Sequence, residues 1–157
     1  MLVVGTAQAA EDAAWQTVRA EDPYSGTNGC VLRSRQLDMP DGYHGARVQL
    51  TLGEKALSVV TDSNIDPSYP GQGIAVDGGA PIAPDAPFPY HGQGAVFILD
   101  RDDLVQQFRR GSTAELALGF WPTWPITETQ RLNISLRGFS AAHDAFLACI
   151  EGAAPAR

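Results

Sequence analysis

Residues that could perform chemistry are few in this chain and lie far apart. The histidines are His44, His91 and His143, and none has a second histidine, a cysteine or a carboxylate at a spacing typical of a metal site. We expect His143 and the neighbouring Asp144 to face solvent from the outer side of a helix. The sequence therefore predicts no metal ion and no cofactor, with a solvated role for each histidine.

A run of oxygen-bearing side chains from Asp62 to Asp66 begins like a calcium-binding loop. Pro67 then stands where the EF-hand pattern requires glycine, and Gly73 stands where it requires a bidentate glutamate, so we reject that pattern. A looser calcium site through Asp62, Asp66 or Asp77 is left open. An enzyme in which these three aspartates converge is kept as a weaker alternative to the functions given below.

The sequence patterns typical of catalytic nucleophiles are also missing. No serine lies in a G-x-S-x-G elbow, and the glycine pairs at positions 71/73 and 92/94 lack the remainder of a phosphate-binding motif. The two cysteines, Cys30 and Cys149, are separated by most of the chain. Because Cys149 points toward the core from a predicted helix and export is expected, we predict a disulfide between Cys30 and Cys149 and no cysteine nucleophile.

Aromatic residues offer a different kind of site. Trp121 and Trp124, together with Phe88 and Tyr90 on another loop, could form an aromatic platform for a sugar or a peptide, held rigid by the flanking prolines. The alternative is that these rings plug the end of the folded domain. The partner of such a platform would be an unidentified protein or glycan.

The elements that must position these residues are mostly short strands. Apolar or alternating runs predict strands near residues 15–20, 30–37, 48–52, 56–61, 73–76, 95–99, 116–120 and 130–137. The run at 95–99 is apolar throughout, which is typical of a central strand. A helix is predicted from its N-cap Asp100 to Arg110, before Gly111. The pattern indicates a mainly β fold, an antiparallel β-sandwich or barrel-like domain with two short helices, one at the C-terminus.

The segment from Gln130 to Glu151 closes the domain with a strand, a sharp turn and a helix. We expect Gly138 to adopt positive φ in the turn and Phe139 to point inward, with Ser140 as the N-cap of the helix. One helix face then carries Ala142, Phe146, Cys149 and Ile150 toward the core. The proline-rich segment 62–93 is interpreted either as a functional loop or as a stiffened covering over a sheet edge.

Length and charge restrict the class of protein. A chain of 157 residues predicts a single domain, here over residues 11–152, with 1–10 as the end of a signal peptide or a disordered tail and 153–157 as a tail. The formal net charge of −7 makes nucleic acid and anionic membranes poor partners, and no apolar stretch is long enough to span a membrane. Ala7-Gln8-Ala9 matches a signal-peptide cleavage pattern, so we expect a periplasmic or secreted protein.

Several short blocks carry a resemblance to a known family. They are Trp15 with Val18, Cys30 to Leu32, Ala75 to Gly79, Ala95 to Gly111, and Leu136 to Ala142. In these blocks the chain resembles the invasion-associated locus B family of bacterial envelope proteins. Ala20 stands where family members often have a cysteine, and residues 90–95 lack the cysteine pair often found there, so the resemblance is to a divergent member. The resemblance implies a secreted or periplasmic β-sandwich without known catalytic residues, and in some pathogens the family is associated with entry into host cells.

Two functions from different classes follow. The first is a non-catalytic, exported envelope or interaction protein, as the family resemblance implies. The second is a carbohydrate- or peptide-binding module that uses the aromatic, proline-rich loop surface. Neither the partner nor the oligomeric state is predicted by the sequence.

Overall fold

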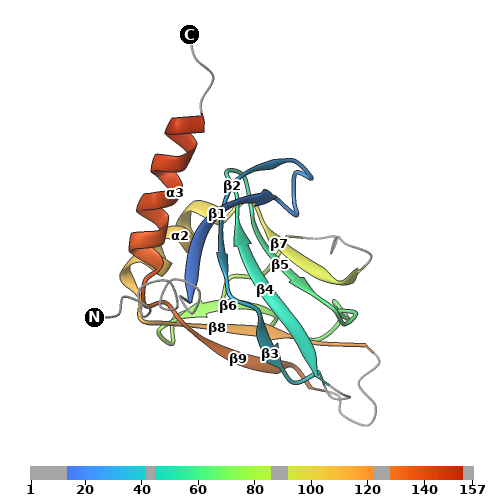
Figure 1. The fold of residues 1–157 in the computed structure, drawn as a ribbon. Coiled ribbons are helices and arrows are strands. Elements are labelled where there is room, and N and C mark those ends of the chain that lie inside the picture. Colours follow the sequence, from blue (N-terminus) through green and yellow to red (C-terminus); the bar gives the residue numbers. More distant parts are fainter. Residues whose placement is uncertain (1–13, 42–44, 86–91, 122–127, 154–157) are drawn as a thin grey trace, which may run out of the picture.

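A computed structural model describes residues 14–41, 45–85, 92–121 and 128–153, which form two antiparallel sheets and two helices (Figure 1). The larger sheet contains, in spatial order, β1 (Trp15–Glu21), β2 (Asn28–Ser34), β4 (Ala46–Leu52), β5 (Leu57–Thr61) and β7 (Gly94–Phe97), and β3 (Leu37–Met39) also pairs with β4. The smaller sheet contains β6 (Gly73–Val76), β8 (Thr113–Leu118) and β9 (Gln130–Ser135) in that order. The helices are α2 (Arg101–Arg110) and α3 (Phe139–Ala153). The predicted antiparallel sandwich with two helices, one of them C-terminal, is confirmed.

The hydrophobic core lies between the two sheets and beneath the helices. Strand side chains alternate between the two faces of a sheet, and one set from each sheet is buried, such as Leu50 and Leu52 from β4 with Leu116 and Leu118 from β8. The predicted apolar face of α2 is buried through Leu104, Val105 and Phe108. Asp100 occupies the predicted N-cap position, but its side chain makes no capping hydrogen bond.

The turn between β9 and α3 has the predicted conformation, and the helix begins earlier than expected. Gly138 has φ 87°, the left-handed region that glycine adopts without a steric penalty. Phe139 is the first helical residue and is only 1% exposed. Ser140 is therefore not the N-cap, and its hydroxyl donates instead to the Arg109 carbonyl oxygen at 3.0 Å, joining α3 to the end of α2.

Two predicted strands differ from the observed ones. The expected strand at 30–37 is divided into β2, which ends at Ser34, and β3, which begins at Leu37. At the break, the Leu50 N–H of β4 donates to the Ser34 hydroxyl at 3.0 Å, and this side-chain contact takes the place of a main-chain hydrogen bond between strands. The expected central strand at 95–99 is wrong in position: β7 ends at Phe97 and lies at one end of the strand order, beside β5. All of β7 is nevertheless buried, and a bridge from Asp85 to Val96 covers part of its outer edge.

The described part of the proline-rich segment 62–93 covers sheet edges. Ile82 pairs with Ile74 beside β6, and Asp85 pairs with Val96 beside β7. The covering interpretation thus holds for residues 82 and 85, and β6 at 73–76 is confirmed as a strand. Among the described residues, no helix has the length and apolar character required to cross a membrane.

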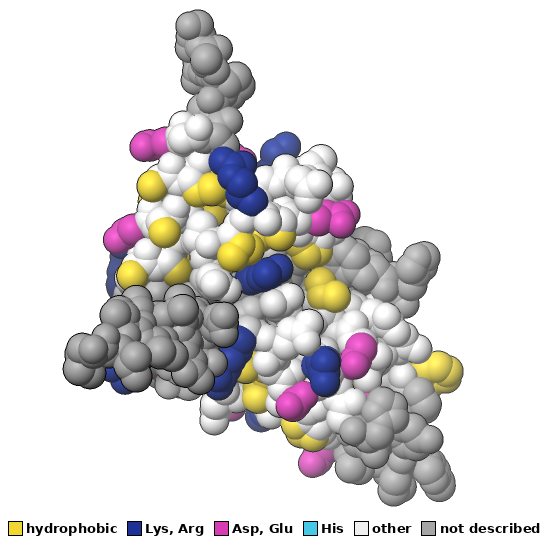
Figure 2. Space-filling view, in the orientation of Figure 1, with side chains coloured by type: hydrophobic (Ala, Val, Ile, Leu, Met, Phe, Trp, Pro, Cys, Tyr) yellow, Lys and Arg dark blue, Asp and Glu magenta, His cyan; other side chains and the backbone are white. Residues whose placement is uncertain are grey.

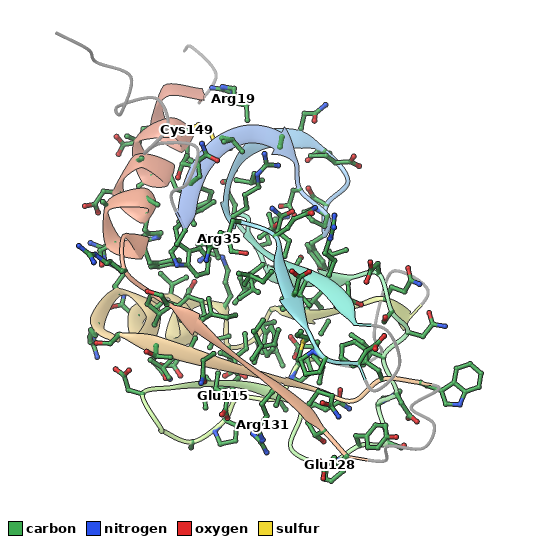
Figure 3. The ribbon with its side chains drawn as sticks, turned by 60° about the horizontal axis from the view of Figure 1, so that its bottom comes forward. Arg19, Arg35, Glu115, Glu128, Arg131 and Cys149 are labelled. Carbon is green, nitrogen blue, oxygen red and sulfur yellow. A yellow bond between two sulfur atoms is a disulfide. The ribbon has the colours of Figure 1, made fainter. Side chains whose placement is uncertain are left out.

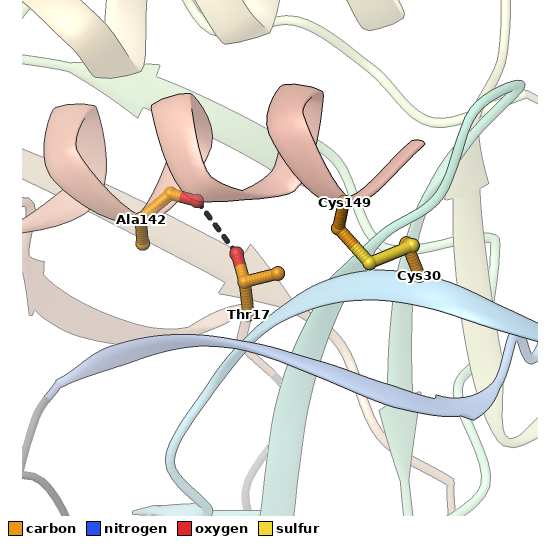
Figure 4. Close-up of a disulfide and its surroundings, with 4 residues drawn as sticks. All are labelled: Thr17, Cys30, Ala142 and Cys149. Atoms are coloured by element: carbon orange, nitrogen blue, oxygen red, sulfur yellow. Dashed lines mark hydrogen bonds between the residues drawn. A yellow bond between two sulfur atoms is a disulfide. The ribbon is translucent and has the colours of Figure 1, made fainter. Parts of the chain in front are cut away.

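The first strands and the last helix are joined covalently (Figure 4). Cys30 on β2 and Cys149 on α3 form the predicted disulfide, which links positions 119 residues apart. Beside it the Thr17 hydroxyl of β1 donates to the Ala142 carbonyl oxygen of α3 at 2.6 Å. Nearer the start of α3, the Trp15 indole N–H donates to the Ser135 carbonyl oxygen at 2.8 Å, so β1 is also attached to the end of β9.

Candidate functional site

A hollow on the described surface lies over the outer face of the three-stranded sheet β6–β8–β9, and we call it the sheet groove. It has a volume of about 280 Å³. Its floor consists of small residues, Gly73 and Ala75 on β6 and Ala117 on β8. Gly73 lies directly opposite Ala117, and Ala75 lies opposite Glu115, so the small side chains of two paired strands leave the space open.

One wall of the sheet groove is fixed by the segment that follows β6. Ile74 and Ile82 exchange two main-chain hydrogen bonds of 3.0 and 2.8 Å, which bring Pro81 to the rim of the groove. Gly73 has φ 145°, and a Cβ there would collide with the Ile82 carbonyl oxygen. Glycine at position 73 is therefore required for this close crossing, and the wall is held in place by backbone contacts.

Asp77 closes one end of the groove. Its carboxylate accepts hydrogen bonds from the Ser112 N–H at 3.1 Å and the Thr113 N–H at 3.0 Å, where the chain enters β8. Asp77 itself has φ 50°, a conformation that Asp tolerates better than most residues. Gly111 lies so close that a Cβ there would collide with the Val76 side chain. The block Ala75 to Gly79 and the glycine at 111, both part of the family resemblance, thus meet in one tight contact.

The other wall carries an exposed ion pair (Figure 3). Arg131 on β9 contacts Glu115 on β8 at 2.9 Å, and their side chains are 56% and 39% exposed. An exposed pair of this kind stabilises a fold by only about 0.2–1 kcal/mol. Asn133 lines the groove directly opposite Glu115 and supplies an amide that can both donate and accept hydrogen bonds.

Charge is not concentrated on the face shown in Figure 2. Over the coloured part of that face, basic and acidic side chains are interspersed, and no continuous patch of one sign is seen. Small apolar side chains follow α3 along its outer side in the same view.

The predicted aromatic platform is described only in part. Trp121 is 62% exposed. Its main-chain N–H donates to the Asn64 carbonyl oxygen at 2.8 Å, so the backbone that bears the ring is anchored. A shallow hollow beside it is lined by Asp66 and Pro67 among other residues. Trp124, Tyr90 and Phe88 lie outside the described residues, so the platform itself stays a prediction.

The three aspartates of the alternative enzyme or calcium site serve different segments. Asp62 accepts from the Arg47 N–H at 2.7 Å, and Asp66 accepts from the Ser68 N–H at 2.9 Å. The bonds from Ser68 lower the pKa of the Asp66 carboxyl. Asp77 holds the start of β8, as described above. Within the described ranges, no group of three or more histidines, cysteines or carboxylates is placed to hold a metal ion.

The prediction of a solvated His143 is wrong. Its side chain is 8% exposed and stacks on Phe139, with ring centroids 5.8 Å apart. The Arg109 guanidinium lies 2.7 Å from His143 Nδ1 and also pairs with Asp144 at 3.0 Å. Burial lowers the pKa of the His143 imidazole, and Arg109 and Arg101 lower it further, while Asp144 opposes them. The ring is thus neutral near pH 7, with Nδ1 accepting from Arg109; Asp144 is exposed as predicted.

His44 and His91 lie outside the described residues. The helical spacing of His143 was the signal that could have placed it correctly, because positions 139, 143, 146 and 150 share one helix face. No comparable signal marks the sheet groove. Its floor depends on which small residues meet across neighbouring strands, and that register is not visible in the sequence.

Comparisons with known proteins agree with this fold. No protein-family model and no curated protein matches the sequence. Among solved structures, the crystal structure of invasion associated protein B from Bartonella henselae is similar, with a TM-score of 0.59 and 20% sequence identity. The similarity covers 88% of this chain and 94% of that chain. The two proteins therefore share their fold over nearly their whole lengths, as the sequence resemblance implies.

Proposed function

We propose that this chain is a divergent relative of the invasion-associated locus B proteins and acts as an exported envelope protein that binds a partner without catalysing a reaction. The observation that carries this proposal is the shared fold, which extends over 88% of the chain. The ending that the resemblance attributes to the family, a strand followed by a glycine-phenylalanine turn and a helix, is present here at Gly138 and Phe139 and supports the same relationship.

The disulfide supports export. Disulfides persist in the periplasm and outside the cell, whereas reducing pathways remove them from most cytosolic proteins. Cys30 and Cys149 join the beginning and the end of the domain, and both are half-buried.

The contacts of the titratable groups support a role in binding. A general acid or base must be able to reach a substrate and exchange a proton with it. Asp77 and the buried Asp41 have oxygens that accept from main-chain N–H groups, and His143 is packed between rings and held by Arg109. These groups are engaged in holding the fold together, which favours an interaction protein over an enzyme.

Fractionation of the native host tests the compartment. We expect the mature protein in the periplasm or the medium, with no alkylatable thiol by intact-mass analysis. A cytosolic protein with two alkylated cysteines would overturn the export proposal.

Affinity capture from envelope extract tests the interaction. The folded, oxidised protein is expected to retain an envelope component that a reduced and denatured sample of the same chain does not retain. The retained component should be recovered unchanged after incubation with the folded protein. Its conversion to a product would refute the non-catalytic role.

A further inference from the structure

We propose that β9 pairs with β9 of a second copy of this chain, so that the two smaller sheets join edge to edge into one continuous antiparallel sheet. Two observations point to this partner: the outer margin of β9 carries unpaired main-chain groups, and its order of side chains is complementary to itself. The inference goes beyond the proposed envelope function and does not depend on it.

The strand register determines which main-chain groups of β9 face outward. The Leu136 N–H donates to the Ser112 carbonyl oxygen, so every second residue before Leu136 also directs its main-chain groups toward β8. The N–H and C=O groups of Arg131 and Asn133 therefore point away from β8. Within the described part of the chain neither residue has a main-chain partner on that side, and both residues are exposed.

Other sheet margins are covered, whereas β9 lacks the features that usually protect an edge strand. Ile82 and Asp85 cover parts of the outer margins of β6 and β7. β9, the outermost strand of the smaller sheet in Figure 1, pairs with β8 without a bulge and contains no proline or lysine. Its one charged residue, Arg131, contacts Glu115 of its own sheet at 2.9 Å. An edge of this kind is a template for a further strand.

One end of this open margin is closed by the first strand. The Trp15 indole N–H donates to the Ser135 carbonyl oxygen at 2.8 Å and so occupies the next outward carbonyl along β9. The free stretch is therefore centred on Leu132, between Arg131 and Asn133. Leu132 is half-buried at the margin of the core, so part of this apolar side chain remains to be covered.

An antiparallel pair with its two-fold axis at Leu132 is complementary to itself. Leu132 then meets Leu132 of the second copy on the inner face, and Arg131 is opposite Asn133 on the outer face. The outward main-chain groups of these two residues become paired, and the Asn133 amide can accept from guanidinium N–H groups that do not contact Glu115. An axis at Arg131 would bring two arginines opposite each other, which like-charge repulsion opposes.

Pairing also joins the two sheet grooves. Arg131 and Asn133 line the groove on the outer face of the smaller sheet. In the pair these residues lie at the junction of two outer faces, so the grooves of the two copies belong to one surface with a two-fold axis between them.

Sedimentation and amide hydrogen exchange of the oxidised full chain, from about 20 μM to about 1 mM, test the pairing. We expect reversible dimerisation, with exchange of the Arg131 and Asn133 amides at least threefold slower at the highest concentration. The Leu132 amide is directed to β8 in the monomer and is the internal control. A chain that is monomeric at about 1 mM would overturn the proposal. Protection of the Arg131 and Asn133 amides only after another protein is added would assign the edge to that protein and would also overturn self-pairing.

Proline at position 133 tests the role of the edge. Asn133→Pro removes an N–H that bonds to no described group of the monomer, and edge strands tolerate proline at such positions. We expect a dispersed spectrum and at least tenfold weaker dimerisation. Asn133→Ala removes the side chain but keeps the N–H, so it is the matched control and should still dimerise. Wild-type dimerisation of a folded Asn133→Pro protein would refute β9 as the interface.

An exchange of two residues tests the register. Asn133→Arg places an arginine opposite Arg131 of the second copy and should weaken dimerisation at least tenfold. Adding Arg131→Asn restores an asparagine opposite each arginine, so the double variant should recover most of the affinity. A double variant as weak as Asn133→Arg would refute pairing about Leu132. Because these measurements use purified protein, their failure leaves the capture of an envelope partner untouched.

Discussion

Phe139 illustrates how much one side chain contributes to this fold. The centroid of its ring lies 5.1 Å from that of Trp15 and 5.2 Å from that of Phe108, and both pairs are edge-to-face. The Phe139 ring therefore joins β1, α2 and α3. Such pairs add stability beyond the burial of their area. The first residue of the last helix is thus at the centre of the aromatic cluster.

Replacing this ring should be costly. Phe139→Ala is expected to lower the free energy of unfolding by about 3–5 kcal/mol, because it empties a buried aromatic site. Leu147→Ala on the same helix is the matched control, since Leu147 is 48% exposed and should lose far less. Urea melts measure both variants. A loss below about 1 kcal/mol for Phe139→Ala would contradict the observed packing.

His143 should make stability depend on pH. Its pKa in the folded state lies below its ordinary value of 6.5. Well above pH 6.5 the ring is neutral in both the folded and the unfolded state. As the pH falls below 6.5, the unfolded chain binds a proton that the folded protein does not bind. The free energy of unfolding therefore decreases with falling pH until the pKa of the folded state is passed. We expect the urea midpoint to decrease from pH 7 to pH 5.

The variant His143→Gln tests the cause of this pH dependence. A glutamine oxygen can accept the Arg109 hydrogen bond but does not titrate, so the decrease in urea midpoint between pH 7 and pH 5 should become smaller. An unchanged decrease would assign it to other groups. Measurements at pH 7 on both proteins control for any general loss of stability.

At the scale of elements, the turn between β9 and α3 determines where the last helix lies. Gly138 has positive φ, and a Cβ added there would meet no atom within 4 Å. The cost of substitution therefore comes from backbone conformation and not from a collision.

This distinction predicts an order of variants. Gly138→Val should destabilise by about 1–3 kcal/mol, the range for a residue held in an unfavourable region, and Gly138→Asn should cost less because asparagine tolerates positive φ. Gly152→Ala near the end of α3 should cause no loss, since that site is open and its φ is not positive. Equal urea midpoints for Gly138→Val and the wild type would exclude a conformational requirement at the turn.

Some of these elements can be predicted from the sequence, and others cannot. Alternation located β4 and β5 because inward positions must be apolar, and the residue types at Asp100 and Gly111 located the ends of α2; both signals depend only on local order. The division at Ser34 and the edge position of β7 depend on which strands become neighbours, and local order does not contain that information. The sheet groove is missed for the same reason, since its floor requires Gly73 and Ala117 to meet across strands.

At the scale of the whole molecule, the disulfide connects the two ends of the domain. A bond that links residues 119 apart restricts the unfolded chain strongly. Cys30 and Cys149 were predictable as a pair because the chain contains no other cysteine. Their contact surface, β1 and β2 against α3, was not predicted.

Removing the disulfide should destabilise the whole domain. The Cys30→Ser, Cys149→Ser double variant is expected to lose about 4–5 kcal/mol in the chain-entropy description. Wild-type protein melted in urea with reductant should approach the double variant, and reductant should leave the double variant unchanged. A loss below about 1 kcal/mol would mean that the noncovalent packing of α3 stabilises the domain almost as well without the disulfide.

The attachment of β1 to α3 also has a consequence for the time course of folding. Trp15, Thr17 and Cys30 emerge first during synthesis, yet their partners Phe139, Ala142 and Cys149 emerge last. Contacts between such distant parts of a chain form slowly because a long loop must close before they are gained. Until then the nascent hairpin exposes an apolar face and a reduced thiol. Completion of the domain therefore waits for α3, which carries the partners of β1 and β2.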